Sequence, residues 1–168
     1  MDGSRAIDGS FEAPADIGAA RRRTRAEVEA RCRGATGSGG EAVVTITAGS
    51  PRGLRPVVTA GTACVVSDLA LWRWDDEELA ALAGQLGPGS SLVFLEPTAA
   101  LGWRRLVHRL GRRLWRLGLG HDFERDVPDA LRAAGLLVGS VDRFGIGPAE
   151  IRSYAWGVAE PFPRSEPE

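Results

Sequence analysis

Two apolar segments with an amphipathic segment between them constrain the fold of this chain most strongly. Residues 63–72 (ACVVSDLALW) and 91–97 (SLVFLEP) are almost continuously apolar, which is typical of strands buried on both faces of a sheet. The segment between them opens on Asp75, a favourable helix N-cap, and places apolar side chains at helical spacing: Leu79, Leu82, Ala83 and Leu86. A helix between two buried strands predicts a parallel sheet with a right-handed crossover, and therefore an α/β fold.

The flanking segments extend this pattern. Residues 17–33 are rich in helix formers but poor in apolar positions, so we expect a solvated helix with a thin buried stripe. The same reasoning predicts four further elements: strands at 42–48 and 56–60, and helices at 100–117 and 128–135. The connection between the last two predicted strands, 136–144 and 151–160, is too short for a crossover, so this pair is expected to be antiparallel.

Three parts are expected along the chain of 168 residues. They are a mobile or partly helical segment at 1–40, an α/β domain at 41–160, and a disordered, proline-rich tail at 161–168. All 21 basic residues are arginine, a bias that we attribute to genome composition, so arginine counts alone do not mark ligand sites.

Charge and composition exclude several classes of protein. A formal net charge of -1 argues against a globally basic nucleic-acid binder, and we expect no nucleic-acid partner. Cys32 and Cys64 lie far apart in the sequence, and no histidine cluster has metal-ligand spacing, so neither a disulfide scaffold nor a metal site is expected. The chain lacks an apolar stretch of the ~20 residues that a membrane span needs and shows no secretory signal. We therefore expect a cytoplasmic protein.

Several motifs in order resemble one known family. VVSDLALW at 65–72, LGPGSSLVFLEP at 86–97, AAGL at 133–136 and RSYAWGVA at 152–159 resemble the C-terminal half of small class I S-adenosylmethionine-dependent methyltransferases. The resemblance covers roughly residues 41–160, and HDFERDVPDALRAAGL at 121–136 resembles a stretch of a membrane-associated, lipid- or thiol-methylating branch. It implies an incomplete Rossmann-like sheet that closes in an antiparallel strand pair, S-adenosylmethionine as cofactor, and a small-molecule methyl acceptor.

The family's strand-GxGxG segment, which binds the cofactor, has no match in this chain. GATGSGG at 34–40 lacks a preceding strand, and the segment 49–62 is too short for a βαβ unit of roughly 30 residues. We therefore assign 42–48 to the family's third strand, and it can pair directly with the 63–72 strand or form a hairpin with 56–60. In that register Gly49 and Ser50 fall where the family has a loop that contacts the adenine of the cofactor, but the acid of that loop is absent here. Thr62 or Ala63 replaces a second acid of the family, at the start of the next strand. From this we expect either a misplaced start codon or a degenerate relative of the family.

Two further cofactor contacts follow from the position of the 63–72 segment. Ser67 and Asp68 come at the carboxyl end of a predicted strand, the edge where ligands bind in open α/β sheets. The resemblance places this pair beside the methionine end of the cofactor and the transferring methyl. The alternative is that Asp68 only caps a loop.

Two residues are candidates for the catalytic base. Glu96 ends the next predicted strand at the same edge, where a carboxylate can orient a substrate or accept a proton; the alternative is a solvated glutamate before Pro97. His121 lies in a glycine-bounded loop, where a neutral imidazole can accept a proton from a thiol or hydroxyl; the alternative is a surface histidine.

The predicted helix at 100–117 has three interpretations. It is a surface helix with its arginines in water, a lid over the substrate pocket, or a site for peripheral contact with anionic membranes. The membrane interpretation uses two tryptophans and five arginines: Trp103, Arg104, Arg105, Arg109, Arg112, Arg113 and Trp115.

Two functional hypotheses follow. The first is an enzyme that transfers a methyl group from S-adenosylmethionine to a small-molecule oxygen, nitrogen or sulfur nucleophile. The second is a catalytically inactive, truncated methyltransferase-like module that acts by binding a partner or an anionic membrane. The absence of the family's first two strands also predicts an open sheet edge, and therefore either a second copy or another chain that covers it, or poor solubility.

Overall fold

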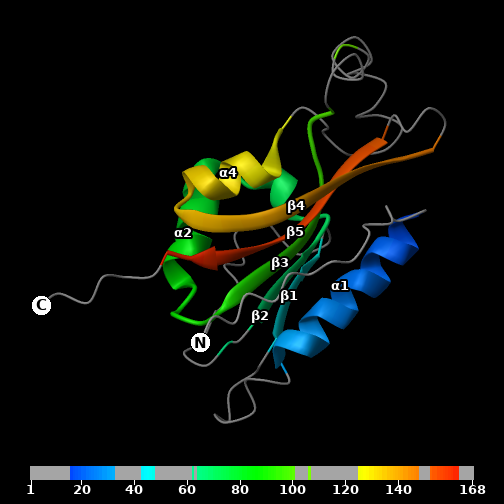
Figure 1. Cartoon of the computed structure of the whole chain (residues 1–168). Coiled ribbons are helices and arrows are strands. Elements are labelled where there is room, and N and C mark those ends of the chain that lie inside the picture. Colours follow the sequence, from blue (N-terminus) through cyan, green and yellow to red (C-terminus); the bar gives the residue numbers. More distant parts are fainter. Residues whose placement is uncertain are drawn as a thin grey trace, which may run out of the picture.

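A five-stranded sheet forms the centre of the protein (Figure 1). The computed structural model describes residues 16–32, 43–47, 62, 64–100, 106, 125–147 and 152–162. In chain order the strands are β1 (Val43–Thr47), β2 (Cys64–Asp68), β3 (Ser91–Pro97), β4 (Leu136–Ile146) and β5 (Arg152–Pro161). Their order across the sheet is β1-β2-β3-β5-β4, with β1, β2 and β3 parallel and β5 antiparallel to both of its neighbours. The predicted α/β fold with a closing antiparallel pair is confirmed.

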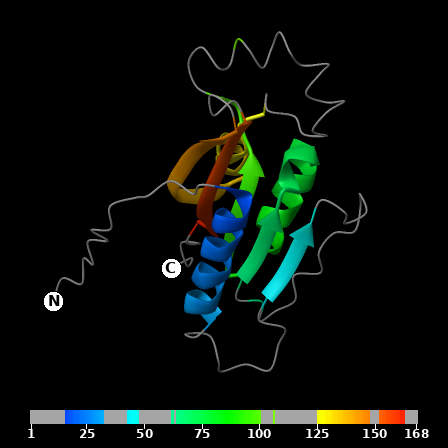
Figure 2. The ribbon, with the colours of Figure 1, turned by 90° about the vertical axis from the view of Figure 1, so that its right-hand side faces the viewer.

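Helices cover both faces of the sheet (Figure 2). One face carries α1 (Ile17–Cys32), and the other carries α2 (Asp76–Gln85) and α4 (Val127–Ala133). A single 3-10 turn, η1 (Leu71–Arg73), connects β2 toward α2. The result is a three-layer α/β/α arrangement.

Both predicted helix starts on the α2–α4 face have local causes. At α2, Asp75 Oδ1 accepts from the Glu78 N–H at 2.8 Å, and Glu78 Oε2 accepts from the Asp75 N–H at 2.9 Å, which forms a capping box. The side chain of Asp126 caps α4, which has Pro128 in its first turn. These local bonds explain why sequence alone located both helices.

The alternation of side chains along the strands divides the core in two. Val65, Leu92 and Phe94 face α2 and α4, whereas Val66 and Leu95 face α1. All five side chains are at least 90% buried. The β2 and β3 segments are apolar at successive positions because both faces of the sheet are covered.

The helix α1 is attached to the sheet by apolar side chains, among them Ile17 and Val28, and by polar contacts to β5. As predicted, its buried stripe is thin and consists of Ala20 and Thr24. The indole Nε1 of Trp156 on β5 donates to Thr24 Oγ1 at 3.1 Å, and the Arg23 guanidinium lies 3.9 Å from the Trp156 ring centroid. The described part of the N-terminal segment, the helix α1, therefore contributes a layer to the fold.

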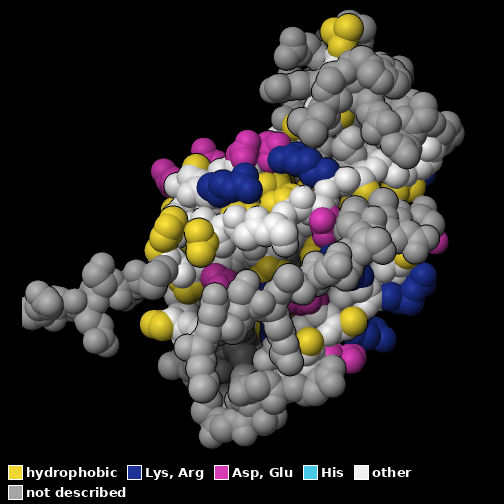
Figure 3. Space-filling model, viewed as in Figure 1, with side chains coloured by type: hydrophobic (Ala, Val, Ile, Leu, Met, Phe, Trp, Pro, Cys, Tyr) yellow, Lys and Arg dark blue, Asp and Glu magenta, His cyan; other side chains and the backbone are white. Residues whose placement is uncertain are grey.

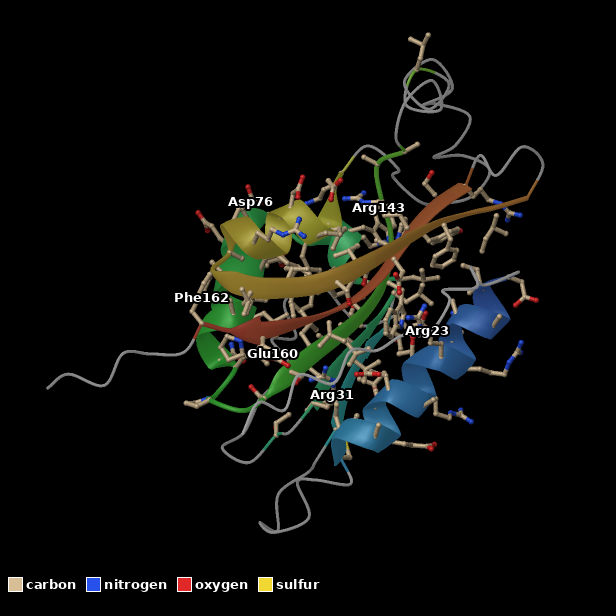
Figure 4. All side chains as sticks on the ribbon, in the orientation of Figure 1. Arg23, Arg31, Asp76, Arg143, Glu160 and Phe162 are labelled. Atoms are coloured by element: carbon tan, nitrogen blue, oxygen red, sulfur yellow. The ribbon has the colours of Figure 1, made fainter. Side chains whose placement is uncertain are left out.

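The C-terminal end of α1 has a second attachment. Arg31 reaches Glu160 Oε1 and Ser91 Oγ, each at 2.8 Å, and so connects α1 with the end of β5 and the start of β3 (Figure 4). The carboxylate of Glu27, one turn earlier, also accepts from Arg31 at 2.8 Å. This arginine is structural, in agreement with the expectation that arginine counts do not mark ligand sites.

One interpretation of the sequence is wrong. The apolar run 63–72 is not one strand, because β2 ends at Asp68 and Leu71–Arg73 form η1. Of the two pairings open to the 42–48 strand, the structure shows the direct one, since β1 is parallel to β2. Its assignment to the family's third strand stays a prediction.

Some predictions fall outside the described residues. They include the strand at 56–60 and the helix at 100–117, of which only Ala100 and Leu106 are described. Ala100 is buried and lies outside any helix, whereas Leu106 is helical and 58% exposed. At the other end of the chain, Pro161 belongs to β5 although the sequence placed it in the tail.

Candidate functional site

The carboxyl edge of the parallel strands carries three of the predicted site residues, but it does not bring all of them together. Ser67 and Asp68 are adjacent in β2, so their side chains point to opposite faces of the sheet. Ser67 joins Glu96 on the face that α2 covers, whereas Asp68 joins Arg21 on the face that α1 covers. Ser67 and Asp68, predicted to face one common ligand, therefore lie on opposite faces of the sheet.

The carboxylate of Glu96 is fully buried and accepts hydrogen bonds from four donors of the protein. The Ser67 hydroxyl donates to Glu96 Oε1. The N–H groups of Ala70 and Leu71 donate to the same oxygen at 3.0 Å each, and the N–H of Trp72 donates to Oε2 at 3.3 Å. The interpretation of Glu96 as a solvated residue is wrong, because its exposed fraction is 0%.

Burial raises the pKa of Glu96 from 4.5 to about 7, because removing the carboxylate from water disfavours its charged form. The four hydrogen bonds act in the opposite direction, since each stabilises the carboxylate. A carboxyl that titrates near neutral pH has the acidity of a general base. Both of its oxygens, however, contact donors of the protein itself, so the role of base stays a prediction.

The main structural effect of Glu96 is on the turn that follows β2. Leu69 has a φ of 57°, in the left-handed region that a branched side chain rarely adopts. Its N–H donates to the Leu95 carbonyl at 2.9 Å, and its own carbonyl accepts from Trp72 Nε1 at 3.0 Å. The next three N–H groups of the chain donate to the Glu96 carboxylate. These bonds end β2 at Asp68 and fix the direction in which the chain leaves the edge.

Asp68 is the predicted site residue that stays partly accessible at this edge. Arg21 Nε lies 2.9 Å from Asp68 Oδ2, and the side chain of Asp68 is 25% exposed. The cavity beside it has a volume of about 290 Å³ and lies between α1 and the sheet. Asp68 is thus a partly exposed carboxylate, paired with an arginine, beside a groove.

The RD pair of the 121–136 motif has a structural role where it is described. Arg125 Nη2 lies 2.5 Å from Asp76 Oδ1 at the start of α2. Asp126 pairs with Arg143 of β4 at 2.8 Å, and Arg143 also donates to Thr98 Oγ1 at 3.3 Å (Figure 4). These bonds hold α4 against α2 and the end of β3.

A larger cavity, of about 820 Å³, lies at the opposite edge of the sheet. It is bordered by Ser91 at the start of β3 and by the ends of α2 and α4. Leu137 and Phe162, which are 50% and 56% exposed, contribute to its rim, and Figure 3 shows hydrophobic side chains at this end of the molecule. Sequence reasoning did not identify this cavity, because its lining comes from α1, α2, β3, β4 and β5 and from the turns that follow α2 and α4.

Arg21 and the backbone donors of Glu96 were also missed. The signal for Glu96 was present, since it lies in an apolar run and precedes proline, but the run alone does not show which groups its carboxylate meets. Gly49, Ser50 and His121 lie outside the described residues, so their roles stay predictions. Within the described ranges, no helix has the length and apolar character needed to cross a membrane.

Comparison by sequence gives no protein-family model and no curated protein that matches. By structure, the chain is similar to LepI in complex with SAM, with 12% identity and a TM-score of 0.45 over 94% of this chain and 45% of that one. The chain is also similar to LaPhzM, with 15% identity and a TM-score of 0.47 over 87% of this chain and 59% of that one. Its similarity to the mitomycin 7-O-methyltransferase MmcR has 20% identity and a TM-score of 0.39, over 59% of this chain and 30% of that one.

This chain spans less than two thirds of the length of each of these proteins. At such identities and TM-scores, none of the likenesses decides its activity, cofactor or substrate. The sheet itself still has the strand directions that the sequence resemblance implies, with parallel strands followed by an antiparallel pair. The described residues therefore form an open α/β sheet that resembles the C-terminal half of a class I methyltransferase domain.

Proposed function

We propose that this protein binds S-adenosylmethionine at the carboxyl edge of β1 and β2 and transfers its methyl group to a small-molecule oxygen, nitrogen or sulfur nucleophile. The observation that carries the proposal is the position of Asp68. It is a partly exposed carboxylate at the end of a parallel strand whose parallel neighbour β1 ends at the same edge. Ligands of open α/β sheets bind outside this edge.

Among the described residues, one side chain, that of Asp68, has the chemistry to contact this cofactor. When bound, S-adenosylmethionine supplies an electrophilic methyl group on a positively charged sulfur. Asp68, which is paired with Arg21 and partly exposed, offers a carboxylate toward the ammonium and sulfonium groups of such a ligand. Ser67 offers no contact, because it is fully buried and bonded to Glu96. Gly49 and Ser50 complete the cofactor contacts in this proposal, and His121 is its candidate base.

Glu96 acts in this proposal as a positioning residue. It holds the N–H groups of the turn after β2, and that turn sets the direction of Asp68. Methyl transfer is an in-line displacement whose rate depends on how well the nucleophile and the methyl group are aligned, so a fixed edge favours it.

Calorimetric titration with S-adenosylmethionine tests the proposal. We expect saturable binding that Asp68→Asn weakens about tenfold, because the substitution keeps the size of the side chain and removes its charge. Asp129→Asn is the matched control, since Asp129 is an exposed carboxylate of α4 that pairs with Arg132. The absence of heat at millimolar cofactor, or equal weakening by both substitutions, contradicts the proposal.

A second candidate is a non-catalytic module, and the burial of Ser67 and Glu96 favours it. Two polar residues at the expected reacting edge bond to the protein itself. In this case the scaffold binds a partner or an anionic membrane, the latter through the arginines and tryptophans of 100–117. Co-sedimentation with vesicles that contain phosphatidylserine is its test. Binding must fall with salt and vanish with neutral lipid, because surface charges are screened beyond about 10 Å at 0.1 M salt.

A further inference from the structure

A groove of about 290 Å³ runs between α1 and the neighbouring face of β1 and β2. Figure 2 shows α1 lying across the sheet with β1 and β2 beside it. The lining comes from both layers: Arg21, Thr24, Arg25 and Val28 of α1, and Val43, Thr45, Val66, Asp68 and Leu95 of the strands. The helical members recur at intervals of three and four residues, which places them on one face of α1.

The floor of the groove is apolar. Val43, Val66 and Leu95 come from three neighbouring strands and belong to the core cluster that faces α1. Leu95 is fully buried and Val66 is 9% exposed, so the floor is fixed by packing. Val28 closes the groove from the helix side. A ligand that enters the groove therefore meets hydrocarbon at its base.

The rim of the groove is cationic. Arg21 is paired with Asp68, which neutralises that end. Arg25 lies one helical turn further along, is exposed, and forms no ion pair with any side chain of the described ranges. A guanidinium presents a planar fork of N–H donors that matches a carboxylate in two-point contact. Charge complementarity therefore favours an anion at the Arg25 end.

The volume limits the size of the ligand. Sites for drug-sized ligands measure roughly 300–1,000 Å³, so this groove lies at the lower limit. A short aliphatic chain or a single ring fits it, and a nucleotide does not. We propose that the groove binds a small organic carboxylate, with the carboxylate on Arg25 and the apolar body on the floor formed by Val66 and Leu95.

This site requires neither S-adenosylmethionine nor methyl transfer, and its test omits the cofactor. The probe is octanoate, titrated into the whole protein and followed by calorimetry and by backbone amide NMR shifts. We expect saturable binding, with shifts at α1, β1 and β2. Octanol carries the same chain without charge, and inorganic phosphate carries charge without a chain. Both should bind at least about tenfold more weakly than octanoate.

Two substitutions and one matched control locate the site. Arg25→Gln removes the proposed carboxylate partner and should weaken octanoate at least about tenfold. Thr45→Phe leaves both arginines in place and fills the groove from β1, so it should abolish binding. Arg22→Gln is the control, because Arg22 is an exposed arginine of the same helix that does not line the groove.

Three outcomes overturn the proposal. One is the absence of octanoate binding at millimolar concentration. Another is equal weakening by Arg25→Gln and Arg22→Gln, which indicates the general charge of α1. The third is equal binding of octanol, which indicates a purely apolar groove. Far-UV circular dichroism of each variant confirms that it is folded. None of these outcomes supports or contradicts the cofactor proposal, which is tested separately by titration with S-adenosylmethionine and with the Asp68→Asn variant.

Discussion

The hydroxyl of Ser67 on β2 donates a hydrogen bond to the carboxylate of Glu96 on β3, and neither side chain is accessible to solvent. The same carboxylate accepts the N–H groups of Ala70, Leu71 and Trp72. One buried acid thus joins two parallel strands and the turn that leaves the first of them. The stability and the pH response of this edge should both depend on it.

Replacing Glu96 should destabilise the protein strongly. Glu96→Ala leaves three backbone N–H groups and the Ser67 hydroxyl without their acceptor, and each buried unsatisfied group costs about 1–3 kcal/mol. We expect urea denaturation to show a loss of about 3 kcal/mol or more in the free energy of unfolding. Glu96→Gln keeps the volume and one acceptor oxygen, so its loss should be smaller.

The matched control for this prediction is Glu77→Ala. Glu77 is an exposed acid in the first turn of α2, where its interaction with the helix dipole is worth about 0.3–1 kcal/mol. Similar losses for Glu77→Ala and Glu96→Ala would mean that the buried network contributes nothing beyond a surface charge.

The raised pKa of Glu96 should make stability depend on pH in a defined direction. Because burial raises this pKa from 4.5 to about 7, the folded protein binds the proton more tightly than the unfolded chain between these values. The contribution of the group to the free energy of unfolding is fully present below about pH 4.5, falls as pH rises, and is lost above about pH 7. The fall corresponds to about 3 kcal/mol.

The measurement is urea unfolding of the wild-type protein and Glu96→Gln at several pH values from 4.5 to 8. Other carboxylates contribute equally to both proteins, so the difference between their stabilities isolates Glu96. We expect the wild-type protein to lose its advantage steadily as pH rises. A difference that stays constant across this range contradicts the prediction.

Local sequence signals predicted the elements whose causes are local. Asp75 and Glu78 form the capping box of α2, and Pro128 and Gly135 bracket α4, so both helices follow from neighbouring residues. The antiparallel direction of β4 and β5 follows from the short segment between them. These features need no knowledge of the rest of the chain.

Contacts between distant segments were not predictable in the same way. The end of β2 at Asp68 depends on Glu96, 28 positions later in the chain. The neighbour of β1 depends on which strand edge is open for pairing, so sequence left its direct pairing with β2 as one of two alternatives. Arg21 and Asp68 are 47 residues apart, and arginines were discounted as a class because the composition is biased. Sequence thus located the carboxyl edge but not the partners of its side chains.

Arg23 should contribute more to stability than its neighbour Arg22. Arg23 stacks on Trp156 at 3.9 Å and pairs with Asp142 at 2.7 Å, so it connects α1 with both β4 and β5. A cation–π contact and a partly exposed ion pair together are worth about 1–2 kcal/mol. Arg23→Ala should lose this amount in urea denaturation and reduce the hydrogen-exchange protection of α1 amides. Arg22→Ala should change stability by less than about 0.5 kcal/mol, and equal effects would refute the connecting role.

Gly157 should not tolerate alanine, whereas Gly139 should. An alanine Cβ at Gly157 would lie 2.7 Å from Phe94 Cζ and 3.1 Å from the Ser140 carbonyl, and Phe94 is fully buried and unable to move away. Overpacking of this kind costs about 1–3 kcal/mol, which urea denaturation should detect. At Gly139 the nearest atom, the Val158 carbonyl oxygen, is 3.8 Å away. Gly139→Ala should therefore be neutral or stabilise by up to about 1 kcal/mol, because alanine restricts the unfolded chain. A larger loss at Gly139 than at Gly157 would contradict the packing of β5 against β3.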